Sequence, residues 1–241
     1  LQDYIPSVFA EADYLINFAV LKGHSAGITL CGKNLYGALI RCPDGALYNR
    51  GDPVYRDYYD MHLSLPNAGW CPGRGYYRAI VDLMGHRQLG GKTLLYLVDG
   101  LFAGYYSEAY PSKWSSAPFN NDWPSSLFVS QDPVAIDSVC HDFLNNEWPL
   151  IVKYGLNKVT TASLQGGAED YLHEAALADN PPSGTFYDPE RDGTNLASLG
   201  VHEHWNNPVD RQYSRNLGLD QGIELVALPR PPPFPTIIYV W

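Results

Sequence analysis

Apolar residues run without interruption through residues 14–21 (YLINFAVL), apart from one asparagine. A continuous apolar run of this length predicts a strand that is buried on both faces of a sheet. Residues 93–98 (TLLYLV) predict a second strand, which we expect to end in a turn at Asp99-Gly100. Residues 126–130 predict a short third strand.

Helical spacing of apolar residues appears between these strands. It predicts helices over residues 28–39, 76–84 and 168–178. The clearest boundary in the chain is at Asp132-Pro133, where Asp can cap a helix and Pro is tolerated in the first turn. Strands that alternate with helices in this way predict one partly parallel sheet with helices packed on it.

Two long stretches are rich in polar and turn-forming residues. Residues 41–75 are too long for an ordinary connector, and such loops are often functional. Residues 182–216 are also turn-rich, and they precede two late strands at 223–228 and 236–240 that we expect to form an antiparallel edge. The expected fold class is α/β, with a mixed, partly parallel sheet flanked by helices, long irregular loops and a single domain over 1–241.

Charge and composition exclude several classes of function. The formal net charge of -10 argues against nucleic acid, which requires clustered Lys and Arg, and against an anionic membrane surface. No apolar stretch is long enough to span a bilayer. Few Lys, 18 Tyr, 6 Trp and 19 Pro favour an extracytoplasmic (periplasmic or secreted) location. The chain starts at Leu1 with no signal peptide, which suggests a processed or cut end.

The four cysteines are Cys31, Cys42, Cys71 and Cys140, and none forms a C-x-x-C pair. An iron–sulfur cluster or a zinc ribbon is therefore not expected from this chain. Cys42 and Cys71 both lie in turn-rich loops. A disulfide between them and two free thiols are equally compatible with the sequence.

Several motifs resemble the domain-of-unknown-function 362 (DUF362) family. They are residues 22–29 (KGHSAGIT), 32–37 (GKNLYG), 96–100 (YLVDG), 129–137 (VSQDPVAID) and 199–208 (LGVHEHWNNP). The resemblance extends from about residue 13 to residue 225. It implies that an N-terminal portion of the domain precedes this chain and that the protein is exported. The ferredoxin-type cysteine motifs of some members are absent, so that role does not transfer.

A second, more distant resemblance, around His24 to Lys33, is to the lactate racemase family. There, a His–Ala-Gly run precedes Gly-Gly-x-Lys, whose lysine anchors a nickel pincer cofactor. Here Cys31 breaks the glycine pair. The resemblance therefore implies a shared architecture and not a shared cofactor.

The first candidate catalytic group follows the strand at 14–21, where α/β sheets commonly place ligands. His24, Lys33 and Asn34 could together bind a small anionic ligand. The alternative is a solvated lysine and a loop histidine. Asp137, one turn inside the helix that starts at Asp132, is the fourth candidate, with a buried structural or site role.

His141 lies four residues after Asp137 and so shares its helix face. A carboxylate that orients an imidazole is common at metal sites, but we expect His141 to form a surface ion pair or a local hydrogen bond. His173 and Glu174, on an alanine-rich helix, are expected to face solvent.

The sequence His202-Glu203-His204 is a candidate metal-ligand cluster. In an extended segment, His202 and His204 point to one side and Glu203 to the other. Two imidazoles could hold a divalent transition metal if a third ligand, such as His24, His62 or Asp60, came from elsewhere. The alternative is a polar loop without metal.

Two classes of function remain open. The first is an enzyme-like protein with an anion or metal site formed by His24, Lys33, Asn34 and Asp137, joined by the histidines at 202 and 204. The second is a structural or interaction protein without catalysis, a subunit of an extracellular assembly with protein partners or self-assembly.

Overall fold

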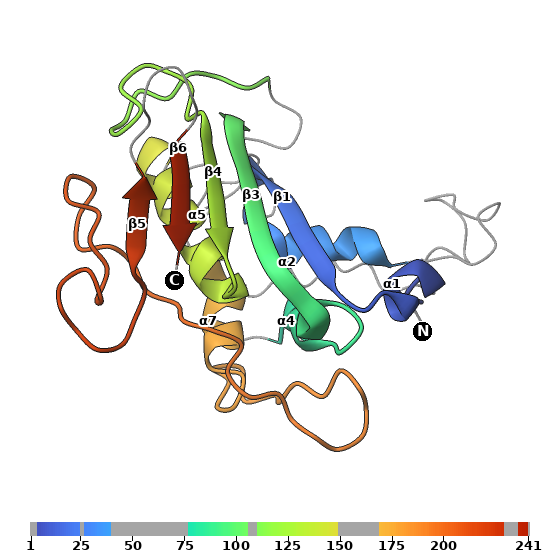
Figure 1. Ribbon diagram of the computed structural model, residues 1–241. Coiled ribbons are helices and arrows are strands. Elements are labelled where there is room, and N and C mark those ends of the chain that lie inside the picture. The colour runs from blue at the N-terminus through green and yellow to red at the C-terminus, as the bar shows by residue number, and fades with distance from the viewer. Residues whose placement is uncertain are drawn as a thin grey trace, which may run out of the picture.

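A computed structural model describes residues 4–24, 27–39, 77–105, 110–148, 169–228 and 236–240. Its centre is a six-stranded sheet in the order β2-β1-β3-β4-β6-β5 (Figure 1). The strands are β1 (Leu15–His24), β2 (Gly27–Thr29), β3 (Thr93–Gly104), β4 (Ser126–Ser130), β5 (Leu225–Leu228) and β6 (Thr236–Val240).

The sheet is mixed, as the sequence predicts. β1 pairs in parallel with β3, and β4 in parallel with β6, whereas β1–β2, β3–β4 and β5–β6 are antiparallel. The predicted antiparallel edge is confirmed, because β6 and β5 close one side of the sheet.

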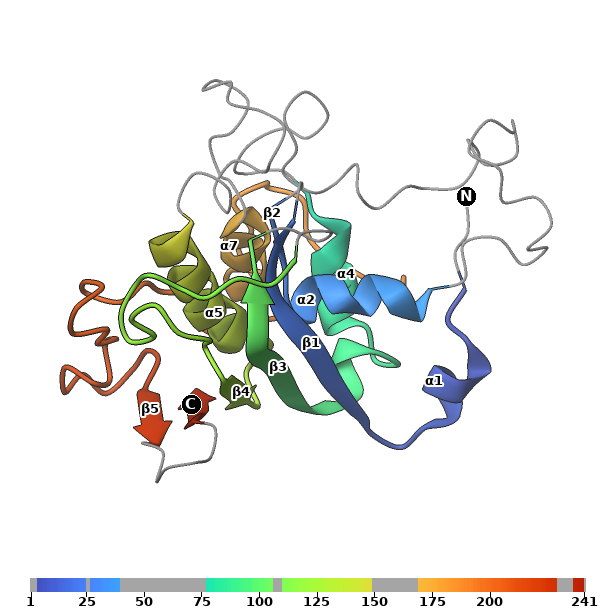
Figure 2. The same cartoon turned by 90° about the horizontal axis from the view of Figure 1, so that it is seen from above.

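The described helices are α1 (Ser7–Glu11), α2 (Cys31–Asn34), η1 (Leu35–Ala38), α4 (Ala79–Gly85), η4 (Gly90–Lys92), α5 (Pro133–Glu147) and α7 (Asp170–Ala176). α5 contacts β1, β3, β4 and β6, and α7 packs on α4 and α5. Figures 1 and 2 show α2, α4, α5 and α7 together on the same side of the strands.

Two of the predicted elements differ from the structure. The chain does not turn at Asp99-Gly100, because both residues stay in β3 and pair with Leu127 and Ser126 of β4. The helix predicted over 28–39 is instead β2, the short α2 and η1. Its first residues satisfy their backbone groups in a hairpin, where Ile28 pairs with Gly23.

The apolar run at 14–21 forms β1, but the prediction that it is buried on both faces is wrong. Asn17, Ala19 and Leu21 are buried against the helices. The alternating residues Ile16, Phe18 and Val20 remain 63%, 56% and 44% exposed. This exposure arises because none of the described helices covers the second face of the sheet.

Helix α5 is the central element of the helical layer and begins where the sequence predicts. The Asp132 carboxylate accepts the N–H groups of Val134 and Ala135, both at 2.8 Å, so the helix is N-capped. The same carboxylate accepts the N–H of Val201 at 3.0 Å, which attaches a distant loop to the helix start. Gly200 lies against it so closely that a Cβ would collide with the carboxylate.

Asp137, one turn further along α5, is completely buried and joins three elements. Its carboxylate accepts the N–H of Cys31 at 2.9 Å and of Gly32 at 2.8 Å, which are the first residues of α2. It also accepts the hydroxyl of Tyr171 on α7 at 2.8 Å. A single side chain thus fixes α2 and α7 relative to α5.

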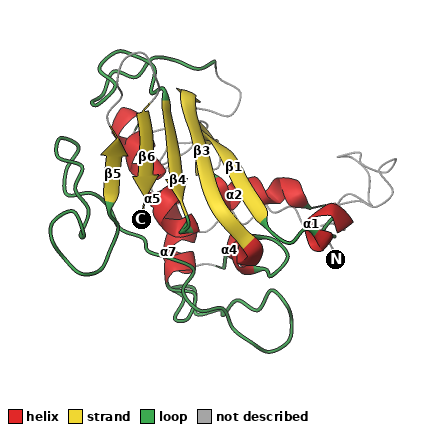
Figure 3. Cartoon of the chain, in the orientation of Figure 1, coloured by secondary structure: helices red, strands yellow, loops and turns green. Residues whose placement is uncertain are grey.

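Residues 177–224, between α7 and β5, contain no helix or strand (Figure 3). This confirms the turn-rich interpretation of the stretch. The chain is nevertheless ordered by side-chain acceptors, since Glu203 accepts the N–H of Ser214 and of Ile223. Within the ranges that the structure describes, no helix is both long enough and apolar enough to cross a membrane.

We predict that Asp137→Asn lowers the free energy of unfolding by about 1–3 kcal/mol, because an amide cannot accept all three donors. Tyr171→Phe removes only one of the three donors and should lower the free energy of unfolding by less.

Burial raises the pKa of Asp137 to about 6, against the lowering effect of its hydrogen bonds to Gly32, Tyr171 and Cys31. The folded chain therefore binds this proton more tightly than the unfolded chain.

The sign of the pH dependence follows from that difference. Between the ordinary pKa of 3.8 and about 6, Asp137 makes the folded chain more stable as pH falls. Chemical denaturation at several pH values should show this pH dependence of the free energy of unfolding in the wild type and not in Asp137→Asn. The difference in free energy of unfolding between the two proteins should therefore become smaller as pH rises toward about 6. An identical slope in both proteins would contradict the assignment.

Candidate metal centre

Three segments that are distant in sequence meet beside the C-terminal half of α5. Helix α5 supplies His141 and Asp142, and the start of α7 supplies Glu169 and His173. The loop held by Asp132 supplies His202 and His204. Asp132 therefore fixes both the start of α5 and the approach of the loop.

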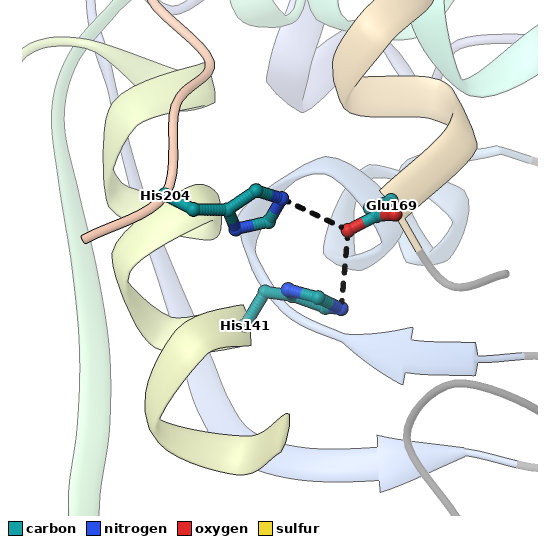
Figure 4. Close-up of side chains that lie close together, drawn as sticks. All are labelled: His141, Glu169 and His204. Carbon is teal, nitrogen blue, oxygen red and sulfur yellow. Dashed lines mark ion pairs between the residues drawn. The ribbon is translucent and has the colours of Figure 1, made fainter. Parts of the chain in front are cut away.

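His141, Glu169 and His204 present three potential ligand atoms to one point (Figure 4). The Oε2 atom of Glu169 is 3.2 Å from Nε2 of His204 and 3.9 Å from Nε2 of His141. All three ligand atoms lie within 4.8 Å of one another. His141 is 4% exposed, whereas the His204 side chain is 44% exposed, so the group opens toward solvent on one side.

These separations suit a metal ion. Two ligand atoms at about 2.05 Å from a tetrahedral metal are about 3.3 Å apart. The two distances to Glu169 lie on either side of that value, so small side-chain shifts would complete the geometry. Two His and one carboxylate are also the ligand set of many catalytic zinc and non-haem iron sites, which keep a further position open.

A second carboxylate orients His204 from behind. The Oδ1 atom of Asp142 accepts from Nδ1 of His204 at 2.6 Å. Its Oδ2 atom accepts the Trp205 N–H at 3.0 Å and the Tyr213 hydroxyl at 2.8 Å. Nδ1 of His204 therefore donates its proton to the hydrogen bond with Asp142, and Nε2 of His204 is directed at Glu169. Carboxylate–histidine–metal sites have the same arrangement.

The pKa shifts of Asp142 and His204 agree with these hydrogen bonds. Burial acts to raise the pKa of Asp142, but the neighbouring His141 imidazole and the hydrogen bonds from His204 and Trp205 hold it below its usual range. Hydrogen bonds to Asp142 and then to Glu169 raise the pKa of His204 to about 10. In the metal-free chain a proton therefore sits between His204 and Glu169, where a metal ion would replace it.

His202 lies beside the triad in a defined tautomer. The Ser138 hydroxyl donates to the Val134 carbonyl at 2.7 Å, so its oxygen must accept from Nδ1 of His202 at 2.8 Å. Nε2 of His202 then carries a lone pair, is buried and has no hydrogen-bond partner among the described residues. The ring contacts those of His173 and His204, with centroids 4.4 and 5.1 Å away.

The structure brings together some of the residues predicted as metal ligands and separates others. His202 and His204 both face the cluster. Glu203 points to the opposite side, as the extended segment predicts, where its carboxylate binds Ser214 and Ile223 and not the histidines. Asp60, His62, Cys42 and Cys71 lie outside the described residues.

Asn34, one of the residues of the predicted anion site at α2, has a structural role. Asn34 donates to Oδ1 of Asn17, and Asn17 donates to the Cys31 carbonyl, both at 2.8 Å, so these amides attach α2 to β1. Lys33 is partly buried, which together with the charge of Lys22 lowers its pKa to about 8. The backbone of His24 ends β1 opposite Gly27.

The remaining contributors were not identified from the sequence as members of this site. Asp142, next to His141, and Glu169, four residues before His173, had spacings that could have indicated them. Of the two alternatives expected for His141, a surface ion pair or a local hydrogen bond, the surface ion pair is wrong, because α5 is buried as far as Leu144. Glu174 is likewise buried, with its carboxylate bound to Ser183 and Tyr187, and not solvated.

Comparison with known proteins gives one match. The family described as Domain of unknown function (DUF362) matches residues 2–142, which is more than half of the chain. No curated protein and no solved structure matches, and the likeness to the lactate racemase family is not supported. His141 and Asp142 lie inside the matched stretch, whereas Glu169, His202 and His204 lie beyond it. The chain belongs to the DUF362 family, whose function is unknown.

Proposed function

We propose that this protein binds a divalent transition metal through His141, Glu169 and His204, and that it is a metal-dependent enzyme-like protein. The observation that carries the proposal is the position of His204 between two carboxylates. Asp142 holds its Nδ1 proton at 2.6 Å, and its Nε2 faces Glu169 at 3.2 Å. An imidazole held from both sides in this way is prepared for a metal at Nε2.

The surroundings of the triad support a reactive site over a closed structural one. Three protein ligands leave at least one coordination position for a substrate or water. His204 is partly exposed, which gives access from solvent, and His141 is buried. A metal ion there would act as a Lewis acid toward a ligand that reaches its open position.

Nitrogen and carboxylate ligands favour Zn²⁺ or Fe²⁺ over Ca²⁺ and Mg²⁺, which prefer all-oxygen sites. The chain's own groups then have separate tasks. Asp142 orients His204, while Asp132 and Ser138 hold the loop and His202 in place. His202 offers a buried acceptor next to the open side.

We predict that the purified protein binds one Zn²⁺ per chain and that Glu169→Gln weakens binding at least about 100-fold, because the amide is a poor ligand. Isothermal titration calorimetry would measure the affinity, and elemental analysis after dialysis would measure retained metal. Zn²⁺ should also raise the melting temperature of the wild type and not of Glu169→Gln.

The matched control is Glu190→Gln. Glu190 also faces a histidine, His86 at 3.5 Å, but without a third ligand in the described residues. This variant should bind Zn²⁺ as the wild type does. Equal affinity of Glu169→Gln and wild type, or no retained metal in the wild type, would overturn the proposal.

We predict that Asp142→Asn weakens metal binding by about 10–100-fold while the stoichiometry stays the same, because it removes the acceptor that orients His204. Tyr213→Phe deletes one hydrogen bond to Asp142 and leaves the carboxylate, so its effect should be smaller. The same calorimetric titration ranks the two variants. A larger loss in Tyr213→Phe than in Asp142→Asn would contradict the role given to Asp142.

A further inference from the structure

The face of the sheet opposite the helices presents apolar side chains to solvent. On β1 these are Ile16, Phe18 and Val20, which are 63%, 56% and 44% exposed. Register places Leu95 beside Ile16 and Leu97 beside Phe18 on β3. We call the whole set the open face; its members are Ile16, Phe18, Val20, Leu95, Leu97, Leu127, Val129, Val226 and Leu228.

The open face includes residues of β1, β3, β4 and β5. Val129 of β4 pairs with Leu97, and Leu127 pairs with Asp99. Register through β6 brings Val226 and Leu228 of β5 into the same row, and Leu228 is 44% exposed. Figures 1 and 2 show the strands with the helices behind them and none of the described helices in front.

A parallel or mixed α/β sheet normally has both faces covered, since a row of apolar residues in water is costly. We propose that a second copy of this chain covers the open face, in a two-fold symmetric dimer that packs sheet against sheet. This inference goes beyond the metal centre and does not depend on it, because the centre lies on the helical side of the sheet.

The area of the open face suits a dimer. A large apolar residue has about 200 Å² of accessible surface. The four exposed members therefore present on the order of 400 Å², and the five half-buried members bring the total to about 600 Å². A stable dimer buries about 800 Å² per partner including its polar rim. The open face lies at the upper end of the range of about 300–600 Å² found for the largest apolar patch on a monomer.

The charges near the open face are compatible with a contact between two copies. The chain carries a net charge of -10, so most encounters between copies are repulsive. Alternation places one acid, Asp99, and one base, Lys22, at the same end of the open face. Asp99 is partly buried and accepts the N–H of Leu101 at 2.8 Å. Two open faces can therefore meet without burying like charges in their centre.

The geometry of two identical sheets is also compatible with such a contact. Twisted sheets stack about 10 Å apart with their strands about 30° from alignment. In a two-fold dimer each residue occurs twice, so Phe18 of each copy contacts the same surface of the other. Because the contact is made by side chains on the sheet face, no strand edge has to open.

Sedimentation equilibrium on the wild-type chain tests the proposal. We expect a dimer at about 100 μM protein and a dissociation constant at least about 100-fold higher for Phe18→Lys, which places two charges in the contact. The matched control is Val209→Lys, because Val209 is 78% exposed in the loop and outside the open face. It should leave the dissociation constant unchanged.

Circular dichroism and melting temperature will show whether Phe18→Lys remains folded, and Phe18→Ser provides a milder second variant with the same expected direction. A wild-type monomer at all concentrations overturns the proposal, as does a dimer that neither Phe18 variant weakens. Binding of a monomer to phosphatidylcholine vesicles through Phe18 would also overturn it, because the open face would then be a lipid-binding surface.

Discussion

A buried carboxylate requires hydrogen-bond donors. Asp137 has three donors, and the packing of the helical layer depends on the elements that provide them. Two come from the start of α2 and one from Tyr171 on α7. His141 follows Asp137 by one turn of α5, and Glu169 precedes Tyr171 by two residues. The interaction that satisfies Asp137 therefore also sets the separation between two ligands of the proposed metal centre.

The same solution recurs along α5 at intervals of five residues. Asp132 accepts the backbone N–H of Val201, and Asp142 accepts Nδ1 of His204 and the N–H of Trp205. In each case a helix carboxylate orders a segment that has no secondary structure of its own. Asp132, Asp137 and Asp142 thus accept internal hydrogen bonds that order the chain where regular backbone pairing is absent.

The two faces of the sheet have different properties for a related reason. On the helical side, polar groups such as Asn17 and Asp137 are buried with partners, and the histidines gather there. On the open face, the β1 residues Ile16, Phe18 and Val20 are apolar and exposed. The proposed metal centre and the proposed dimer contact therefore lie on opposite sides of one sheet, and a substitution on one side can leave the other intact.

Local patterns in the sequence determined the strands, the capped start of α5 and the mixed α/β class, because periodicity, Pro at the first turn and Asp at the cap act over a few residues. The sequence also indicated that His202 and His204 face one way and Glu203 the other. It could not show that β1 is covered on one face only, since coverage depends on where the helices pack. It could not select Glu169 and Asp142 as partners of His204, because contacts between α5, α7 and the 177–224 loop arise only when buried carboxylates find their donors across the folded chain.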